Sequence, residues 1–199
     1  MSMLSVYRDL SSGDGTAVPL EVTLDGERIS QLLRGLGVRF ERWPAGRALA
    51  DGASQEDILA AYAKEVARLS AEGGYLTADV VRIARGTPNT APMRAKFLSE
   101  HRHSEDEVRF FVEGAGSFYL HVEDRVYHVL CERNDLLSVP VDTRHWFDMG
   151  TDPTFCAIRL FINPQGWVAQ FTGDAIAARF PTHDEALSRL RAQAQPPQP

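Results

Sequence analysis

The chain has 199 residues, of which 44% are hydrophobic and 24% charged, an ordinary balance for a globular protein. Its formal net charge of -6 argues against nucleic acid and anionic membranes as partners, because both require basic patches. No secretory leader, membrane-length apolar run or disulfide framework is visible in the sequence, so we expect a cytoplasmic protein.

The first third of the chain mixes short strands with helices. Apolar patterning predicts strands at 3–10, 18–24 and 38–43 and a short helix at 27–36. A longer helix is predicted over 55–70, because Ser54 and Asp57 form a capping-box pattern ahead of an apolar face. An amphipathic helix of this kind is expected to cover a sheet.

The composition changes at Ala78, after which short β-rich segments follow one another at close spacing. The predicted strands are 79–84, 94–100, 107–113, 117–122, 125–131, 136–139, 144–148 and 155–162. Many short strands separated by turn signals indicate a β-sandwich or barrel. A short helix near 184–191 precedes a Pro- and Gln-rich tail, and no break in composition calls for a second domain.

A group of residues suited to metal binding lies in the middle of this β-rich region. His101 and His103 are two residues apart, so on a strand their imidazoles would point the same way. Glu107 comes four residues later, about 13 Å along a straight strand, whereas metal–ligand bonds are only about 2 Å long. The chain must therefore turn at residues 104–106, so that Glu107 opens a neighbouring strand.

A fourth ligand has to come from elsewhere, and His145 is the candidate because it follows a turn and begins a predicted strand. Three neutral imidazoles and one carboxylate suit a borderline divalent ion such as Fe, Ni, Mn or Zn. In an octahedral shell this set would leave two positions open for a substrate. The other histidines, His121, His128 and His183, lack this pattern, and we expect them to be structural or exposed.

These residues resemble the two sequence motifs of the cupins. The first motif reads His-x-His-x-x-x-Glu with a glycine after six more residues, as at residues 101–114. The second reads Pro-x-Gly-x-x-His, as at residues 140–145. Three glycines of the pattern are replaced, by Ala95, Asn134 and Asp142. Because Asn and Asp tolerate left-handed backbone geometry, the turns in the second motif can survive.

Over about 75–181 the sequence resembles the acireductone dioxygenases of methionine salvage. Three long stretches carry this resemblance: RAKFLSEHRHSEDEVRFFVEG, ERNDLLSVPVDTRHWFDMG and AIRLFINPQGWVAQFTGD. The resemblance implies a mainly β fold, a cupin barrel (a double-stranded β-helix or jelly roll) with a few peripheral α-helices. It implies a single domain, 1–199, with the barrel core at about 75–165, strand and helix decoration at 1–74, and a helix and tail at 182–199.

The resemblance also implies a reaction and its partners. With one Fe²⁺ or Ni²⁺ per chain, the enzyme would cleave 1,2-dihydroxy-3-keto-5-methylthiopentene, a methylthio-acireductone, with O₂. In this family the iron form yields formate and 4-methylthio-2-oxobutanoate, and the nickel form yields formate, carbon monoxide and methylthiopropionate. The partners would be this small molecule and O₂, without nucleic acid or membrane, and a monomer is expected.

Two arginines lie among apolar residues of the predicted barrel. Arg109 shares strand parity with Glu107 and is expected to face the metal, where it would neutralise an enediolate dianion. The alternative for Arg109 is an ion pair with an acid such as Glu113. Arg159 is expected either to contact the substrate or to form a structural ion pair.

Aromatic and acidic residues near the ligands complete the predicted site. Phe147 shares the face of His145, Phe97 lies on the predicted strand leading to the first ligand, and Trp167 follows the last barrel strand. By the resemblance, these three rings form an apolar wall for the methylthioethyl tail. Glu100 and Asp106 flank the ligand segment, and they are expected to orient the ligands or to form turns; the resemblance links their positions to metal loading.

Two other classes of protein are compatible with the ligand pattern. One is a metal-dependent cupin, such as a sugar isomerase, that uses Zn or Mn purely as a Lewis acid and consumes no O₂. The other is a cupin without catalytic activity that serves as a binding or storage module. A complete ligand set with open positions argues against the second class.

Overall fold

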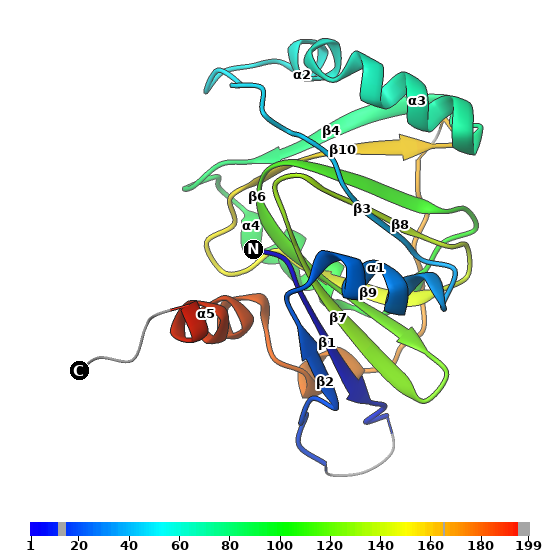
Figure 1. Cartoon of the computed structure of the whole chain (residues 1–199), viewed down its shortest axis with the longest axis vertical. Coiled ribbons are helices and arrows are strands. Elements are labelled where there is room, and N and C mark those ends of the chain that lie inside the picture. Colours follow the sequence, from blue (N-terminus) through cyan, green and yellow to red (C-terminus); the bar gives the residue numbers. More distant parts are fainter. Residues whose placement is uncertain (12–14, 165, 195–199) are drawn as a thin grey trace.

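The computed structural model describes residues 1–11, 15–164 and 166–194, and its strands form two connected sheets (Figure 1). One sheet has the strand order β11-β5-β9-β6-β7-β1-β2, and the other contains β4, β10, β6, β8 and β3. The first three strands are β1 (Met3–Arg8), β2 (Glu21–Thr23) and β3 (Arg39–Arg42). The remaining strands are β4 (Thr77–Ile83), β5 (His101–Arg102), β6 (Glu107–Val122), β7 (Arg125–Glu132), β8 (Asp135–Val139), β9 (Arg144–Asp148), β10 (Phe155–Phe161) and β11 (Gln170–Phe171). The expectation of a mainly β fold is confirmed.

Strand β6 belongs to both sheets and joins them. Its first half pairs with β8 and β10, and its second half pairs with β7 and β9. Two separate strands were predicted here, at 107–113 and 117–122, with a turn between them. The glycines at that point instead keep the strand continuous: Gly114 has a φ of +65°, and a Cβ there would lie 1.9 Å from the carbonyl oxygen of Thr154. The glycine signal therefore marks a close approach of two strands rather than a turn.

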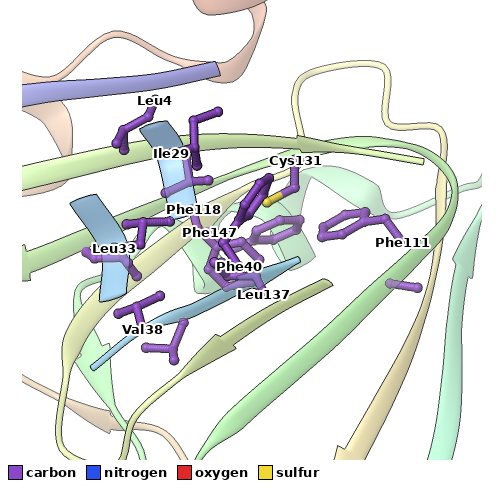
Figure 2. Packing of buried hydrophobic residues seen from close by; sticks show 14 of the residues in the cluster. Leu4, Ile29, Leu33, Val38, Phe40, Phe111, Phe118, Cys131, Leu137 and Phe147 are labelled. Atoms are coloured by element: carbon purple, nitrogen blue, oxygen red, sulfur yellow. The ribbon is translucent and has the colours of Figure 1, made fainter. Parts of the chain in front are cut away.

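The main hydrophobic core lies between the two sheets, and Figure 2 shows its packing. Leu4, Phe118 and Phe147 come from one sheet, and Phe40 and Leu137 come from the other. Burial of this many aromatic and branched side chains, at roughly 25 cal/mol per Å², supplies the main driving force that holds the sheets together. The N-terminal strands take part in this barrel, since β1 pairs with β7 and β3 pairs with β8.

The helices cover the outside of the barrel (Figure 1). They are α1 (Gly26–Arg34), α2 (Gln55–Ala61), α3 (Ala63–Gly73), α4 (Thr90–Leu98), the short 3₁₀ helix η1 (Ile176–Arg179) and α5 (His183–Ala194). The predicted helix over 55–70 is two helices, because the backbone leaves helical geometry at Tyr62, where φ is -112° and ψ is 24°. The predicted capping box at Ser54 and Asp57 is confirmed.

The prediction of a strand at 94–100 is wrong, because most of that segment lies in helix α4. Helix α4 is rich in strong helix formers such as Ala, Met, Arg, Lys and Leu, and its proline, Pro92, lies in the first turn, where a proline is tolerated. Phe97 therefore lies on a helix that packs against β9, and not on a strand.

Within the described part of the chain, no helix is long and apolar enough to cross a membrane.

Candidate metal centre

Three histidines and one glutamate meet at one end of the barrel. The four side chains, from His101, His103, Glu107 and His145, are buried, and each offers a ligand atom within 4.8 Å of the others. His101 and His145 are directly opposite each other in the β5–β9 pair, and a bend at residues 104–105 brings Glu107 back beside them. The four predicted ligands are therefore brought together, with the predicted change of direction between His103 and Glu107.

Each imidazole is oriented by a backbone carbonyl. The Nδ1 atoms of His101 and His145 lie 2.7 Å from the carbonyl oxygens of Ser99 and Thr143, and Nδ1 of His103 lies 3.1 Å from that of Val168. A carbonyl can only accept, so we assign the proton of each ring to Nδ1. In every ring the lone pair of Nε2 is then free to bind a metal.

The arrangement of acceptors fits a bound cation. Carboxylate atom Oε2 of Glu107 lies 3.0 Å from Nε2 of both His103 and His145. With the assigned tautomers these contacts bring lone pairs together, which is unfavourable unless a positive charge lies between them. The other oxygen, Oε1, is buried and has no hydrogen-bond partner among the described residues. Three imidazoles and a carboxylate in this state are the donor set that a borderline divalent metal prefers.

The protonation states agree with a ligand role. Burial and the neighbouring His145 lower the pKa of His101 to about 4, so this imidazole is neutral at neutral pH. Burial alone would raise the pKa of Glu107, but Arg109 and the neighbouring imidazoles outweigh it and hold that pKa well below its usual range. Burial opposes protonation of His103, yet the Glu107 carboxylate raises its pKa overall. The centre therefore offers an ionised carboxylate at Glu107 and a neutral imidazole at His101, and both can bind a cation.

A cavity of about 430 Å³ opens beside these ligands, and Arg109 lies in its wall. Nε of Arg109 is 2.8 Å from Oε1 of Glu107, an ion pair whose orientation does not make a hydrogen bond. The guanidinium carbon also lies 4.4 Å from the ring centre of Phe147. The predicted inward position of Arg109 is found, and the alternative pairing with Glu113 is not, since Glu113 pairs with Arg82 at 3.1 Å.

Arg159 lies beside Arg109 in the wall of the same cavity, because the two residues are paired across β10 and β6. Its guanidinium donates two hydrogen bonds to Asp79, at 2.8 and 2.6 Å. The predicted structural ion pair is therefore present, and Arg159 also lines the cavity; its contact with a substrate stays a prediction.

The three predicted aromatic residues line the cavity. The rings of Phe97 and Phe147 pack edge to face at 6.2 Å, and Trp167 stacks on His103 at 5.9 Å. Trp167 also donates from its indole nitrogen to the carbonyl of Asp106, and the Asp106 carboxylate accepts from the backbone of Val141. Asp106 thus ties the ligand turn to the aromatic wall.

Glu100 and the remaining histidines lie outside the ligand cluster. The Glu100 carboxylate accepts from Thr172 at 2.7 Å and lies 2.6 Å from Nδ1 of His121. His128 and His183 lie on either side of the Ser117 hydroxyl, each at 2.9 Å. All three of these histidines are buried, so of the two predicted roles the structure supports the structural one.

Sequence reasoning missed several residues of the cavity wall: Asp79, Lys96, Phe161 and Phe171. Phe161 could have been found, because it shares strand parity with Arg159 on β10. Asp79 reaches the cavity wall because β4 pairs with β10, and Lys96 reaches it because its segment forms helix α4. Neither relation is visible in the local pattern of the sequence.

A two-sheeted barrel that buries three histidines and one glutamate at one end defines a metal-binding cupin. A model of the ARD/ARD' family matches residues 19–169, and the chain belongs to that family. The acireductone dioxygenase of Pseudomonas paraeruginosa is 59% identical over 181 residues, which cover 91% of this chain and 98% of that relative. The acireductone dioxygenase of Hahella chejuensis is 54% identical over 187 residues, which cover 94% of this chain and 98% of that relative.

A solved structure agrees with this assignment. It is described as acireductone dioxygenase from Bacillus anthracis with cadmium ion in active center, and it is 31% identical with a TM-score of 0.70. The match covers 86% of this chain and 98% of that chain. The cupin fold expected from the sequence is thereby confirmed.

Proposed function

We propose that this chain is an acireductone dioxygenase that uses one Fe²⁺ or Ni²⁺ held by His101, His103, Glu107 and His145. The observation that carries the proposal is the buried cluster of these four side chains, with its unsatisfied carboxylate oxygen, at the wall of a cavity. The identity of 59% to a curated acireductone dioxygenase along nearly its whole length supports the same conclusion. When bound, the ion supplies Lewis-acid chemistry for the oxygens of the enediolate.

Arg109 is the residue that we assign to the charge of the substrate. A divalent ion would take over the Glu107 carboxylate, which is the ion-pair partner of Arg109. The buried guanidinium would then need another anion, and an enediolate oxygen supplies one. Arg109 would thus bind the dianion and hold its charge in place during cleavage.

The aromatic side of the cavity is assigned to the methylthioethyl tail. Phe97, Phe147 and Trp167 form an apolar wall there, and Arg159 is neutralised by Asp79 at its edge. An apolar wall facing one polar anchor orients the tail away from the reacting oxygens. The same rings exclude water from the reacting end of the substrate.

The products would depend on the metal. Cleavage to 4-methylthio-2-oxobutanoate and formate uses one O₂ per substrate, and so does cleavage to methylthiopropionate, formate and carbon monoxide. Three imidazoles and one carboxylate do not discriminate sharply among first-row divalent ions, so one polypeptide would give both outcomes. The enzyme would act in methionine salvage as a cytoplasmic monomer.

The test is to remove the metal and reload separate samples with Fe²⁺ and Ni²⁺, and then to add the acireductone and O₂. We expect formate from both samples and carbon monoxide from the nickel sample alone. Two variants control for the ligand set: His145→Ala should retain little metal and form little product, whereas His128→Gln should load normally, because it lies outside the cluster. Identical products from both metals would reject metal control of the outcome, and the absence of O₂ uptake would favour a Lewis-acid cupin.

A further inference from the structure

Lys96 lines the cavity but has no role in the proposed reaction. It lies in the last turn of α4, and its exposed side chain lines the metal cavity. It also lines a second hollow of about 440 Å³, which adjoins the first and includes Glu100 and Asp174. Lys96 and Phe171 are the two residues that contribute to both hollows, and Phe171 lies 5.8 Å from the ring of His101. An exposed residue that lines a cavity borders its opening.

Lys96 differs from the two arginines of the cavity in its charge balance. Arg109 is paired with Glu107 and Arg159 is paired with Asp79. Across the part of the chain that the structure describes, the ammonium group of Lys96 forms no ion pair and no hydrogen bond. Lys96 is thus a cavity cation that is not directly paired with a carboxylate of the described residues.

The helix that carries Lys96 is held firmly against the barrel. Arg94 donates two hydrogen bonds to Asp148 on β9, at 2.7 and 2.9 Å, and Phe97 packs against Phe147. Residues on either side of Lys96 are therefore fixed to strand β9, which carries His145. The backbone of Lys96 is thus held in place beside the opening of the cavity.

The net negative charge of the molecule repels an anionic substrate. The formal net charge of the chain is -6, so an anion in solution is repelled on average. An uncompensated cation at the opening reverses this repulsion locally and raises the local concentration of the anion. The effect acts at a distance through water, so it shows in the rate of capture and is weakened by salt.

We propose that Lys96 is a positioning residue that captures the anionic acireductone at the opening of the cavity and passes it inward to Arg109. The inference rests on the proposed function, since it requires an anionic substrate. A unit charge about 6 Å from a monoanion in water changes the capture rate by about threefold at low ionic strength. At roughly 0.5 M salt the difference should shrink to less than about twofold.

The chain offers a matched control, because Lys64 and Lys96 are its only two lysines. Lys64 is also exposed, but it lies on α3 and outside both hollows. Metal-loaded wild type, Lys96→Gln, Lys96→Arg and Lys64→Gln are compared for kcat and kcat/KM with the acireductone across a range of ionic strength. Anaerobic titration with the acireductone gives Kd for each protein and does not depend on turnover.

We expect Lys96→Gln to lose about threefold in kcat/KM at low salt, with kcat nearly unchanged, a weaker Kd and a flatter salt dependence. Lys96→Arg and Lys64→Gln should match wild type. Equal salt dependence in Lys96→Gln and wild type would overturn the proposal, and so would a loss confined to kcat. Either result would leave the proposed function intact as long as wild type consumes O₂; an inactive wild type would refute the proposed function instead.

Discussion

Arg109 and Glu107 form an ion pair in a site where both are almost completely buried. Burial lowers the pKa of Arg109, and the Glu107 carboxylate opposes that shift. In the barrel wall each of the two groups neutralises the charge of the other. A metal ion bound to Glu107 would compete with Arg109 for the same carboxylate. This competition makes the role of the arginine testable separately from metal binding.

Arg109→Met should fold, retain its metal and lose activity. The methionine fills the apolar surroundings of the guanidinium, and the metal takes over the compensation of Glu107. Because the dianion loses its charge-assisted partner, we expect kcat/KM to fall by about 100-fold or more, with the metal content measured by elemental analysis unchanged. Arg82→Met is the matched control, because Arg82 on β4 pairs with Glu113 on β6 and lies outside the cavity. Near-normal turnover in Arg109→Met would show that this residue does not meet the substrate.

At the scale of residues, the sequence was most informative where a residue type has one physical use. The substitution of family glycines by Asn134 and Asp142 predicted left-handed backbone at both positions, and their φ angles are +87° and +61°. The ligand set was predictable for the same reason, since His-x-His and a nearby Glu have few structural uses inside a barrel. The partners of Arg109 and Arg159 were not predictable, because strand parity gives the face of a residue but not its neighbours.

At the scale of elements, helix α4 carries the largest error of the sequence-based prediction. Its residues Arg94 to Phe97 alternate in polarity over too short a length to distinguish strand from helix. What holds the helix in place is Asp148, which is 54 residues from Arg94 in the sequence and wholly buried. Such a long-range ion pair leaves no mark on the local pattern of either segment.

Arg94→Met should loosen α4 without touching the metal ligands. The Asp148 carboxylate would keep its hydrogen bonds from the backbone nitrogens of Gly150 and His183 but lose its charged partner. We expect unfolding to become easier by about 2 kcal/mol, since a hydrogen-bonded charge is left partly unpaired. We also expect KM to rise more than kcat falls, because α4 positions Phe97 and Lys96.

The stability of Arg94→Met is measured by urea unfolding, and its activity by O₂ uptake. Arg68→Met serves as the control, because Arg68 forms an exposed pair with Glu72 one helical turn away, and such pairs contribute only about 0.3–0.5 kcal/mol. A loss in Arg94→Met no greater than that in Arg68→Met would contradict the anchoring role of Arg94.

At the scale of the whole molecule, acid stability should depend on a buried histidine far from the metal. Burial and the neighbouring His183 lower the pKa of His128 to about 3, with Asp148 opposing and Arg189 assisting this shift. An unfolded histidine titrates near 6.5, so between these values the unfolded chain binds a proton that the native protein excludes. The stabilisation is therefore fully present above about pH 6.5 and is lost as the pH falls towards about 3.

As the pH falls, the free energy of unfolding of His128→Gln should decrease less steeply than that of wild type. Glutamine keeps a hydrogen-bonding group near Ser117 but has no proton to gain. The free energy of unfolding from urea titrations, compared at several pH values between about 4 and 7, should differ in slope by up to about 1.4 kcal/mol per pH unit. Parallel curves for the two proteins would show that His128 is not responsible.

Because strand β6 is paired on both sides, the part of the cavity wall that it forms should open only rarely. The strand that carries Glu107 and Arg109 is hydrogen-bonded on both sides, by β8 and β10 in one half and by β7 and β9 in the other. Its amide protons can exchange with solvent only when neighbouring strands separate, which requires the barrel itself to open. Another part of the wall is made by Trp167 and Phe171, which lie beyond the last long strand. Breathing of the cavity is therefore expected at this segment, while the strand that carries Glu107 and Arg109 stays still.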